Sequence, residues 1–457
     1  MTKNFNNFSI PKEYLENLCD ISRVTNQIDG YYYDKYNVKR GLRNQDGTGV
    51  LVGLTSIGEV SGYIIADNEK EAVPGKLIYR GVDIRDIVED VASSNRHGFE
   101  EVIFLLLFGI LPTQEQLAEF KELIGILRLL PDGFTEDMIL KTPCKDIMIK
   151  LSRSVLALYS YDDNPDDTSV LNVLKQSIEL IAKFPTLAAY AYQAKSRYFD
   201  GKSLYLHTPK IEFSTAESFL YMLRPDNKFT KLEADILDLM LILHAEHGGG
   251  NNSTFAAHVV TSSGTDIYSA VAAAIGSLKG PKHGGANAKV TKMARDIMEH
   301  VENWENDDEI AAYLEKIVRK EAFDRTGLIY GMGHAVYTIS DPRAELLREK
   351  ARELAKERGA LKELSVYEAV ERLGPEVLAK VKGGKKDICA NVDLYSGFVY
   401  QMLNIPQELC TPLFAVSRVV GWCAHILEEN IAGGRIIRPA YKSVSKRIAY
   451  TPLEERE

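Results

Sequence analysis

The sequence predicts a mainly α-helical, multihelical fold in two domains, with a few short strands near the N-terminus. Its 457 residues exceed the length of one small domain. The composition, 45% hydrophobic and 26% charged, is typical of a globular protein with a buried core. Long apolar runs that end at glycine or proline predict most of the helices.

The elements follow in chain order from local signals. Residues 49–65 are rich in Val, Ile and Gly, which predicts short strands. Residues 99–113 are apolar nearly all round, which predicts a buried helix that stops at Gly109. Residues 232–247 predict another long helix, ended by the three glycines 248–250.

The second half of the chain continues this pattern. Residues 303–316 form an acidic stretch that we expect on the solvated surface. Residues 341–359 predict a helix with Asp341 as its N-cap, proline at its first position and Gly359 closing it.

Charge and cysteine usage exclude several classes of protein. The formal net charge of −9 disfavours nucleic acid or an anionic membrane as a partner. Five scattered cysteines without a CxxC spacing disfavour a disulfide framework or a zinc site and suit a reducing cytoplasm. The N-terminus lacks the pattern of a signal or transit peptide, and no apolar run reaches membrane-spanning length. We therefore expect a cytoplasmic protein.

Six of the nine histidines lie between His244 and His334. His244 and His247 flank Glu246 at the end of one predicted helix, a spacing that leaves a metal site open although no third ligand follows at a useful distance. His247 directly precedes the three glycines, where a ligand could approach the backbone. We expect His244 to be a core residue, and structural or surface positions for His258 and His300.

His283 stands between Gly-Pro and a double glycine, directly before a helix with Asn287 in its first turn. The positive end of that helix disfavours the imidazolium, so a neutral ring could donate a hydrogen bond to an oxygen that gains charge. A glycine-rich hinge with an incidental histidine is the other interpretation.

His334 follows two glycines, Gly331 and Gly333, which would let backbone amides approach a bulky ligand. Arg343, nine residues later, could bind a carboxylate through two hydrogen bonds. Asp393 begins a further predicted helix, so it is either an N-cap with a low pKa or a partly desolvated general base.

Six motifs in order resemble the citrate synthase family: "HAEHGGGNNST", "GPKHGGAN", "GMGHAVYTISDPRA", "NVDLYSG", "FAVSRVVGWCAHILE" and "RIIRP". The similarity spans about Gly41 to Pro439. The resemblance implies a homodimeric, mainly α enzyme that condenses acetyl-CoA with oxaloacetate to citryl-CoA and hydrolyses it to citrate, a reaction of the tricarboxylic acid cycle. It implies no cofactor beyond the CoA thioester substrate, and no metal.

The same resemblance implies roles for individual residues. Asp393 would remove a proton from the acetyl methyl group, His283 would donate to the thioester oxygen, and His334 would polarise the oxaloacetate carbonyl. The residues expected to bind oxaloacetate are His247, Arg343, Arg418 and, from the partner subunit of the homodimer, Arg438. The residues expected to contact CoA are Arg43, Gly331, Gly333 and Lys385.

The resemblance also implies a small helical domain of residues 283–393, which would close over a large domain of residues 1–282 and 394–457. One departure is Thr338, where the family often has a basic residue that contacts CoA. The residues before about Gln27 match no known pattern.

Three alternatives remain open. A 2-methylcitrate synthase would use propionyl-CoA and share the motifs. A metal-dependent hydrolase would use His244, Glu246 and His247. A non-catalytic protein on the same scaffold would bind oxaloacetate without releasing CoA.

Overall fold

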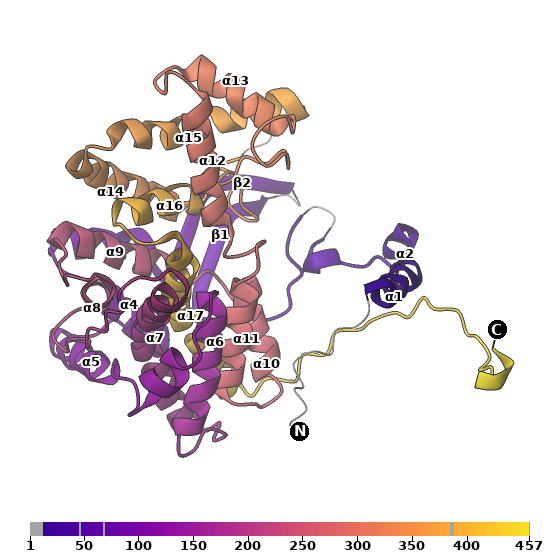
Figure 1. Ribbon diagram of the computed structural model, residues 1–457, viewed down its shortest axis with the longest axis horizontal. Helices are drawn as coiled ribbons and strands as arrows, with labels where there is room; N and C mark the ends of the chain where they lie inside the picture. Colours follow the sequence, from indigo (N-terminus) through magenta and orange to yellow (C-terminus); the bar gives the residue numbers. More distant parts are fainter. Residues whose placement is uncertain (1–11, 45–46, 67–68, 384–387, 457) are drawn as a thin grey trace. The chain divides into compact units, whose positions relative to one another are not determined.

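The computed structural model describes residues 12–44, 47–66, 69–383 and 388–456. The chain divides into two units (Figure 1). The first unit combines the N-terminal residues up to Gly53 with the segment from Arg438 onward, and the second unit spans Leu54–Ile437.

The first unit contains short elements without buried residues. They are α1 (Lys12–Thr25), α2 (Gly30–Lys35) and the 3-10 turns Arg40–Leu42 and Leu453–Glu455. Several of its apolar side chains are almost fully exposed, including Tyr441 at 96% and Ile448 at 90%. Such exposure indicates a surface suited to packing against something else.

The second unit begins with a three-stranded antiparallel sheet of β1 (Gly58–Ala66), β2 (Glu69–Tyr79) and β3 (Val82–Asp83), in that order. Gly58 pairs with Tyr79 across the first two strands. The prediction of strands in residues 49–65 is confirmed for β1. Strand β2 was not predicted, because its charged residues, proline and glycine hide the alternation of a strand.

Helices make up the rest of this unit. They are α3 (Ile84–Ser93), α4 (Phe99–Phe108), α5 (Gln114–Leu127), the π-helical turn Thr135–Leu140, α6 (Ile147–Leu158), the 3-10 turn Tyr159–Tyr161, α7 (Val170–Phe199), α8 (Thr215–Leu223), α9 (Lys231–His244), α10 (Asn252–Thr261), α11 (Ile267–Leu278), α12 (Ala286–His300), α13 (Asp307–Val318), α14 (Pro342–Arg358), α15 (Leu361–Lys382), α16 (Asp393–Met402), the 3-10 turn Gln407–Leu409 and α17 (Cys410–Ala432). The mainly α fold class is confirmed.

Helix α17 runs through the core and packs against α4, α7, α9, α10 and α11. Contrary to the sequence analysis, the segment Gln407–Ala432 is long and apolar enough to cross a membrane by length and composition. However, 89% of its most apolar window is buried inside the protein, as expected for a core helix.

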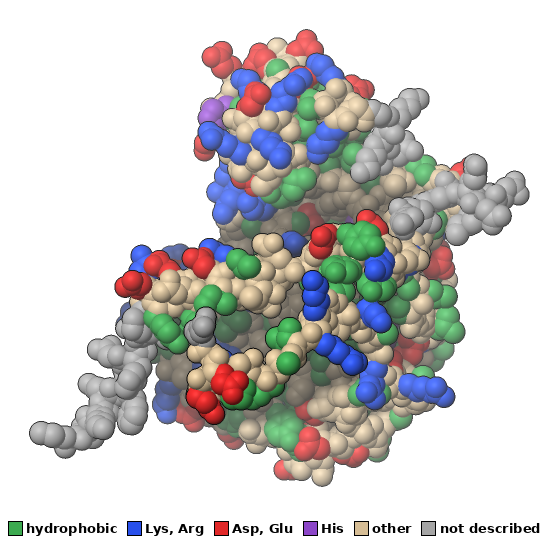
Figure 2. Space-filling view, turned by 90° about the vertical axis from the view of Figure 1, so that its right-hand side faces the viewer, with side chains coloured by type: hydrophobic (Ala, Val, Ile, Leu, Met, Phe, Trp, Pro, Cys, Tyr) green, Lys and Arg blue, Asp and Glu red, His purple; other side chains and the backbone are tan. Residues whose placement is uncertain are grey.

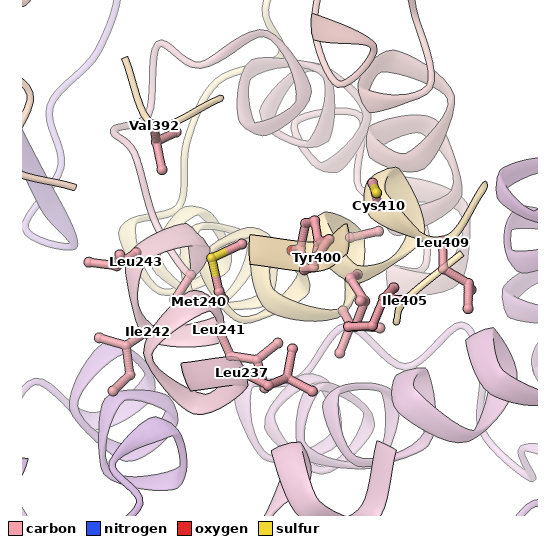
Figure 3. Packing of buried hydrophobic residues seen from close by; sticks show 14 of the residues in the cluster. Leu237, Met240, Leu241, Ile242, Leu243, Val392, Tyr400, Ile405, Leu409 and Cys410 are labelled. Atoms are coloured by element: carbon pink, nitrogen blue, oxygen red, sulfur yellow. The ribbon is translucent and has the colours of Figure 1, made fainter. Parts of the chain in front are cut away.

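Helix α9 leads directly to the histidine motif. Figure 3 shows its side chains, including Met240 and Leu241, in the apolar cluster with Tyr400 of α16 and Ile405. The helix ends at His244, three residues before the predicted end, so His247 lies in the turn that follows. Gly248 then adopts a φ of 82°, which a residue with a side chain rarely adopts.

Two predicted helices are confirmed with their ends. Helix α4 is capped by Gly109 at a φ of 75°. Helix α14 has Asp341 as N-cap and Gly359 as C-cap at a φ of 69°. The acidic stretch 303–316 was predicted to be solvated, and this is only partly correct. The stretch includes most of helix α13, which has three acidic residues in its first turn but buries one apolar face.

Helices α12 to α16 gather at one end of the second unit, at the top of Figure 1. Pairs among them pack together, such as α13 with α15 and α14 with α16. Acidic and basic side chains are interspersed over this end in the face that Figure 2 shows. The division into a small domain of residues 283–393 and a large domain stays a prediction.

Candidate active site

The loop before His334 is joined by backbone hydrogen bonds to the segment before Asp393. The Gly333 N–H donates to the Cys389 carbonyl at 2.8 Å, and the Asn391 N–H donates to the Gly331 carbonyl at 2.9 Å. Gly331 has a φ of 83°, and a Cβ there would lie 2.9 Å from Leu394. Glycine is therefore required where the two motifs meet.

The ring of His334 has a defined tautomer. Its Nδ1 accepts the backbone N–H groups of Val336 and Tyr337, both at 3.1 Å. A nitrogen that accepts cannot carry the proton, so the neutral ring carries it on Nε2. The ring of Tyr337 stacks on His334 with centroids 4.6 Å apart and holds its orientation.

His247 lies against the same two rings, 5.1 Å from His334 and 5.6 Å from Tyr337 between centroids. Its Nε2 is buried and has no hydrogen-bond partner among the described residues. Burial, followed by the positive charges of Arg343 and Arg418, holds the pKa of His247 well below its usual value. The result is a neutral imidazole with an unused polar atom.

Arg418 is fully buried and only partly satisfied. Its Nε donates to the His244 carbonyl at 2.7 Å, whereas Nη1 and Nη2 have no partner within the described part of the chain. Burial lowers the pKa of Arg418 to about 10, and the nearby Glu246 opposes this shift. An unpaired buried guanidinium is costly unless an anion binds it.

Arg343 is bound by Asp341, a partner that the sequence analysis did not assign to it. Its Nε and Nη2 donate to the two carboxylate oxygens at 3.0 and 2.7 Å. Asp341 also caps α14 and accepts the N–H of Val392 at 3.3 Å, so it links α14 to the start of α16. One edge of the Arg343 guanidinium is thus occupied, and a substrate carboxylate would have to use the other edge.

Asp393 is the first residue of α16, and the N-cap of this helix is Val392. Asn391 instead accepts the Asp393 N–H at 3.0 Å. Burial raises the pKa of Asp393 to about 6, opposed by the charge of Arg343. The N-cap interpretation is therefore wrong, and the raised pKa suits a general base.

His283 lies in the turn before α12, and the predicted start of this helix after the glycines is confirmed. Its Nε2 is 3.0 Å from the Ser253 hydroxyl, which also accepts the indole N–H of Trp422 at 3.1 Å. Burial, with a smaller effect of Arg418, lowers the pKa of His283 to about 4. The ring is therefore neutral near pH 7.

These side chains form two neighbouring groups, and the positive charge of Arg418 acts on a histidine in each group. His247, His334 and Arg343 surround Tyr337, while His283 and Arg418 both contact the ring of Phe414, at 6.2 and 4.8 Å from its centroid. The charge of Arg418 lowers the pKa of both His247 and His283. No hydrogen bond joins Asp393 to either group among the described residues.

The structure places only some of the residues that were expected to contact CoA or the partner subunit. Arg43 and Arg438 belong to the first unit and are exposed, so their positions relative to the site stay undetermined. Lys385 lies outside the described residues. The Gly333 N–H is occupied by Cys389, and the Thr338 hydroxyl is buried without a partner among the described residues.

The three residues of the metal alternative have separate partners. His244 is buried and its Nδ1 donates to the Met240 carbonyl at 2.8 Å, which confirms it as a core residue. Glu246 pairs with His425 at 3.0 Å, and His247 contacts His334. Within the described ranges, no group of three His, Cys, Asp or Glu residues is arranged to hold a metal ion.

Sequence reasoning missed four residues that position the site: Ser253, Tyr337, Asp341 and His425. Asp341 was assigned only as a helix cap. Tyr337 contacts His334 three residues before it, but also His247 far away in the chain. His425 contacts Glu246 across 179 residues. No local spacing indicates these two distant contacts.

Comparisons with known proteins agree with this arrangement. A sequence model described as "Citrate synthase, C-terminal domain" matches residues 45–440. The chain belongs to the citrate synthase family. It is 36% identical to the citrate synthase of Haloferax volcanii over 92% of this chain and 99% of that protein. It is 32% identical to a 2-methylcitrate synthase of Shewanella oneidensis, over 81% and 90% of the two chains.

A solved structure of the family shares the fold. It is the ternary complex of carboxymethyl coenzyme A and oxaloacetate with citrate synthase from Thermoplasma acidophilum. The TM-score is 0.73 at 27% identity, covering 92% of this chain and 99% of that one. The chain is thus an enzyme of the citrate synthase family, as its six motifs predict.

Proposed function

We propose that this enzyme condenses acetyl-CoA with oxaloacetate and water to give citrate and CoA. The observation that carries the proposal is that two neighbouring side chains, Arg418 and His247, have buried polar atoms without a hydrogen-bond partner among the described residues. These atoms are the two terminal nitrogens of Arg418 and the Nε2 of His247. A small dicarboxylate with a carbonyl group would satisfy them.

In this mechanism oxaloacetate binds first through its carboxylates. Arg418 offers a planar pair of donors, and the free edge of Arg343 offers another. His247 completes the hydrogen bonds. His334 donates its Nε2 proton to the carbonyl of oxaloacetate, because its Nδ1 is held as an acceptor by two backbone amides.

Enolisation of acetyl-CoA is the difficult step, since the methyl protons of a thioester are weakly acidic. Asp393 takes one of these protons, and His283 donates a hydrogen bond to the thioester oxygen as it gains charge. This requires the tautomer in which Ser253 donates to Nε2 and Nδ1 carries the proton. A preorganised donor of this kind typically lowers the activation free energy by about 3 kcal/mol.

The new carbon–carbon bond then forms between the enol carbon and the oxaloacetate carbonyl carbon. The carbonyl oxygen receives the Nε2 proton of His334 and becomes a hydroxyl group. The proton that Asp393 removed from the methyl group then replaces it on His334, so both residues return to their starting state. Water hydrolyses the resulting citryl-CoA thioester, which releases citrate and the CoA thiol. Closure of the small domain, residues 283–393, excludes water during the first step.

The assembly in this proposal is a homodimer in which each Arg438 reaches the neighbouring site. The first unit supports it, because its helices bury nothing within the chain while its apolar side chains, such as Tyr450 at 83%, are exposed. Arg43, Gly331 and Lys385 contact CoA in this proposal. The enzyme needs no cofactor or metal and acts in the cytoplasm, within the tricarboxylic acid cycle.

A thiol-release assay with oxaloacetate and a series of short acyl-CoAs tests the proposal. We expect acetyl-CoA to have the highest kcat/KM. One extra methylene changes binding by only about 1–3 kcal/mol, so both substrates can react and the ratio decides. A higher kcat/KM for propionyl-CoA would make the enzyme a 2-methylcitrate synthase, and release with neither would refute the proposal.

A further inference from the structure

A row of four hydrogen-bonded side chains begins beside the site and leads away from it. Glu246 Oε1 is 3.0 Å from His425 Nε2, and His425 Nδ1 is 3.2 Å from His258 Nε2. His258 Nδ1 is in turn 3.1 Å from Glu429 Oε2. We call these residues the Glu246–Glu429 row. Glu246 and His425 are both completely buried.

The row has a proton requirement that follows from counting donors. When both end carboxylates are ionised, each only accepts, so His425 then donates from Nε2 and His258 donates from Nδ1. The remaining contact joins two imidazole nitrogens and needs one more proton. The two rings therefore carry three N–H protons together, which means that they share one positive charge.

Other charges around His425 favour this state. Glu428 Oε2 lies 3.8 Å from its Nδ1 and is held by the Thr55 hydroxyl at 2.6 Å. Burial, followed by the charge of His425, lowers the pKa of His258. Arg418 is a second positive charge that acts on Glu246, beside the charge of His425.

Glu246 and Arg418 are opposite charges in the same buried region, yet no ion pair joins them among the described residues. Within the described part of the chain, Glu246 Oε2 has no hydrogen-bond partner, and neither do the terminal nitrogens of Arg418. Glu246 Oε1 instead accepts the Gly248 N–H and pairs with His425. A Cβ at Gly421 would lie 2.3 Å from Oε2, so this position must be glycine for the carboxylate to stay where it is.

We propose that His425 and His258 are positioning residues that hold the Glu246 carboxylate by their shared charge and thereby keep Arg418 free for a carboxylate of oxaloacetate. Without that charge, Glu246 turns to Arg418, whose charge already acts on it, and competes with the substrate. The proposal rests on the proposed function, which assigns oxaloacetate to Arg418.

The test is the variant His425→Gln, since glutamine can donate one hydrogen bond to Glu246 but cannot carry charge. We expect the Kd and KM for oxaloacetate to rise about tenfold or more, with kcat at saturation and the KM for acetyl-CoA within about twofold. The double variant Glu246→Gln/His425→Gln removes the competing charge as well. It should recover most of the lost affinity.

The control is His97→Gln, which removes a histidine bonded to Asp235 at 3.1 Å outside this region and should leave oxaloacetate affinity unchanged. Wild-type affinity in His425→Gln would overturn the proposal, as would a double variant no better than the single one. If His425→Gln does not fold, His258→Gln breaks the second contact at a less buried position and carries the same expectations. Calorimetric titration of oxaloacetate measures affinity without turnover. Wild-type enzyme that binds oxaloacetate but forms no citrate would thus refute the reaction and not this proposal.

Discussion

Arg418 shows how a single buried side chain can indicate a ligand. Its guanidinium is held at Nε, while its two terminal nitrogens face no acceptor among the described residues. Such a charge destabilises the ligand-free protein, and the lowered pKa of Arg418 reflects this. The binding of an anion would reverse the penalty.

We predict that Arg418→Met weakens oxaloacetate binding by about 100-fold, because two charge-assisted hydrogen bonds are lost. The Tm of the ligand-free variant should stay equal or rise, since a buried unpaired charge is removed. Calorimetric unfolding with and without oxaloacetate measures both effects. A variant that oxaloacetate still stabilises as strongly as wild type would rule out this binding role.

The raised pKa of Asp393 predicts how activity depends on pH. A base must be ionised, so kcat/KM for acetyl-CoA should fall as pH decreases through about 6, the raised pKa of Asp393. The same shift has a known sign for stability: the folded state binds the proton more tightly, so this group makes the fold less stable as pH rises from about 4 to 6. A pH–rate profile measures where kcat/KM falls on the acidic side. A fall centred near pH 4 would show that the base is an ordinary carboxylate.

At the level of elements, the sequence predicts what local chemistry decides. Helix α14 is predicted correctly because Asp341 and Gly359 act on their own backbone. The pairing of Asp341 with Arg343 was not predicted. The position of Asp341 two residues before Arg343 is already explained by its role as helix cap, so the sequence does not indicate an additional ion pair. The contact of Glu246 with His425 spans 179 residues, and no local pattern encodes it.

The joined loops before His334 and Asp393 give a prediction at this scale. Gly331→Ala places a Cβ 2.9 Å from Leu394 at a φ of 83°, which should displace both catalytic segments and lower kcat by about 100-fold. The matched control is Gly359→Ala, which has a φ of 69° but open space around its Cβ. We expect the control to lose about 1 kcal/mol of stability and no activity. Equal kcat in the two variants would show that the loop contact does not position the site.

Across the whole molecule, the mainly α class and the order of the site motifs could be predicted, because helix periodicity and the six motifs are read along the chain. The sheet partner β2 could not, since its strand signal is weak and its pairing depends on tertiary contacts. The roles of Arg43 and Arg438 depend on an assembly, so neither the sequence nor one chain fixes them.

The proposed homodimer predicts complementation between inactive subunits. Arg438→Ala and Asp393→Ala are each expected to be inactive, but a mixed dimer contains one site with both residues intact. A purified mixed dimer should therefore recover about half of wild-type activity. The measurement is thiol release by purified mixed dimers carrying two different tags. Mixed dimers as inactive as both parents would contradict a site shared between subunits.

The proposed mechanism depends most on Asp393 as the base that acts on acetyl-CoA bound beside oxaloacetate. The direct measurement compares wild type with Asp393→Asn by thiol release and by oxaloacetate titration. We predict that CoA release slows by a factor of about 100 to 10,000 while the Kd for oxaloacetate changes less than about twofold. Equal losses in rate and affinity, or a variant that still releases CoA at the wild-type rate, would contradict the account.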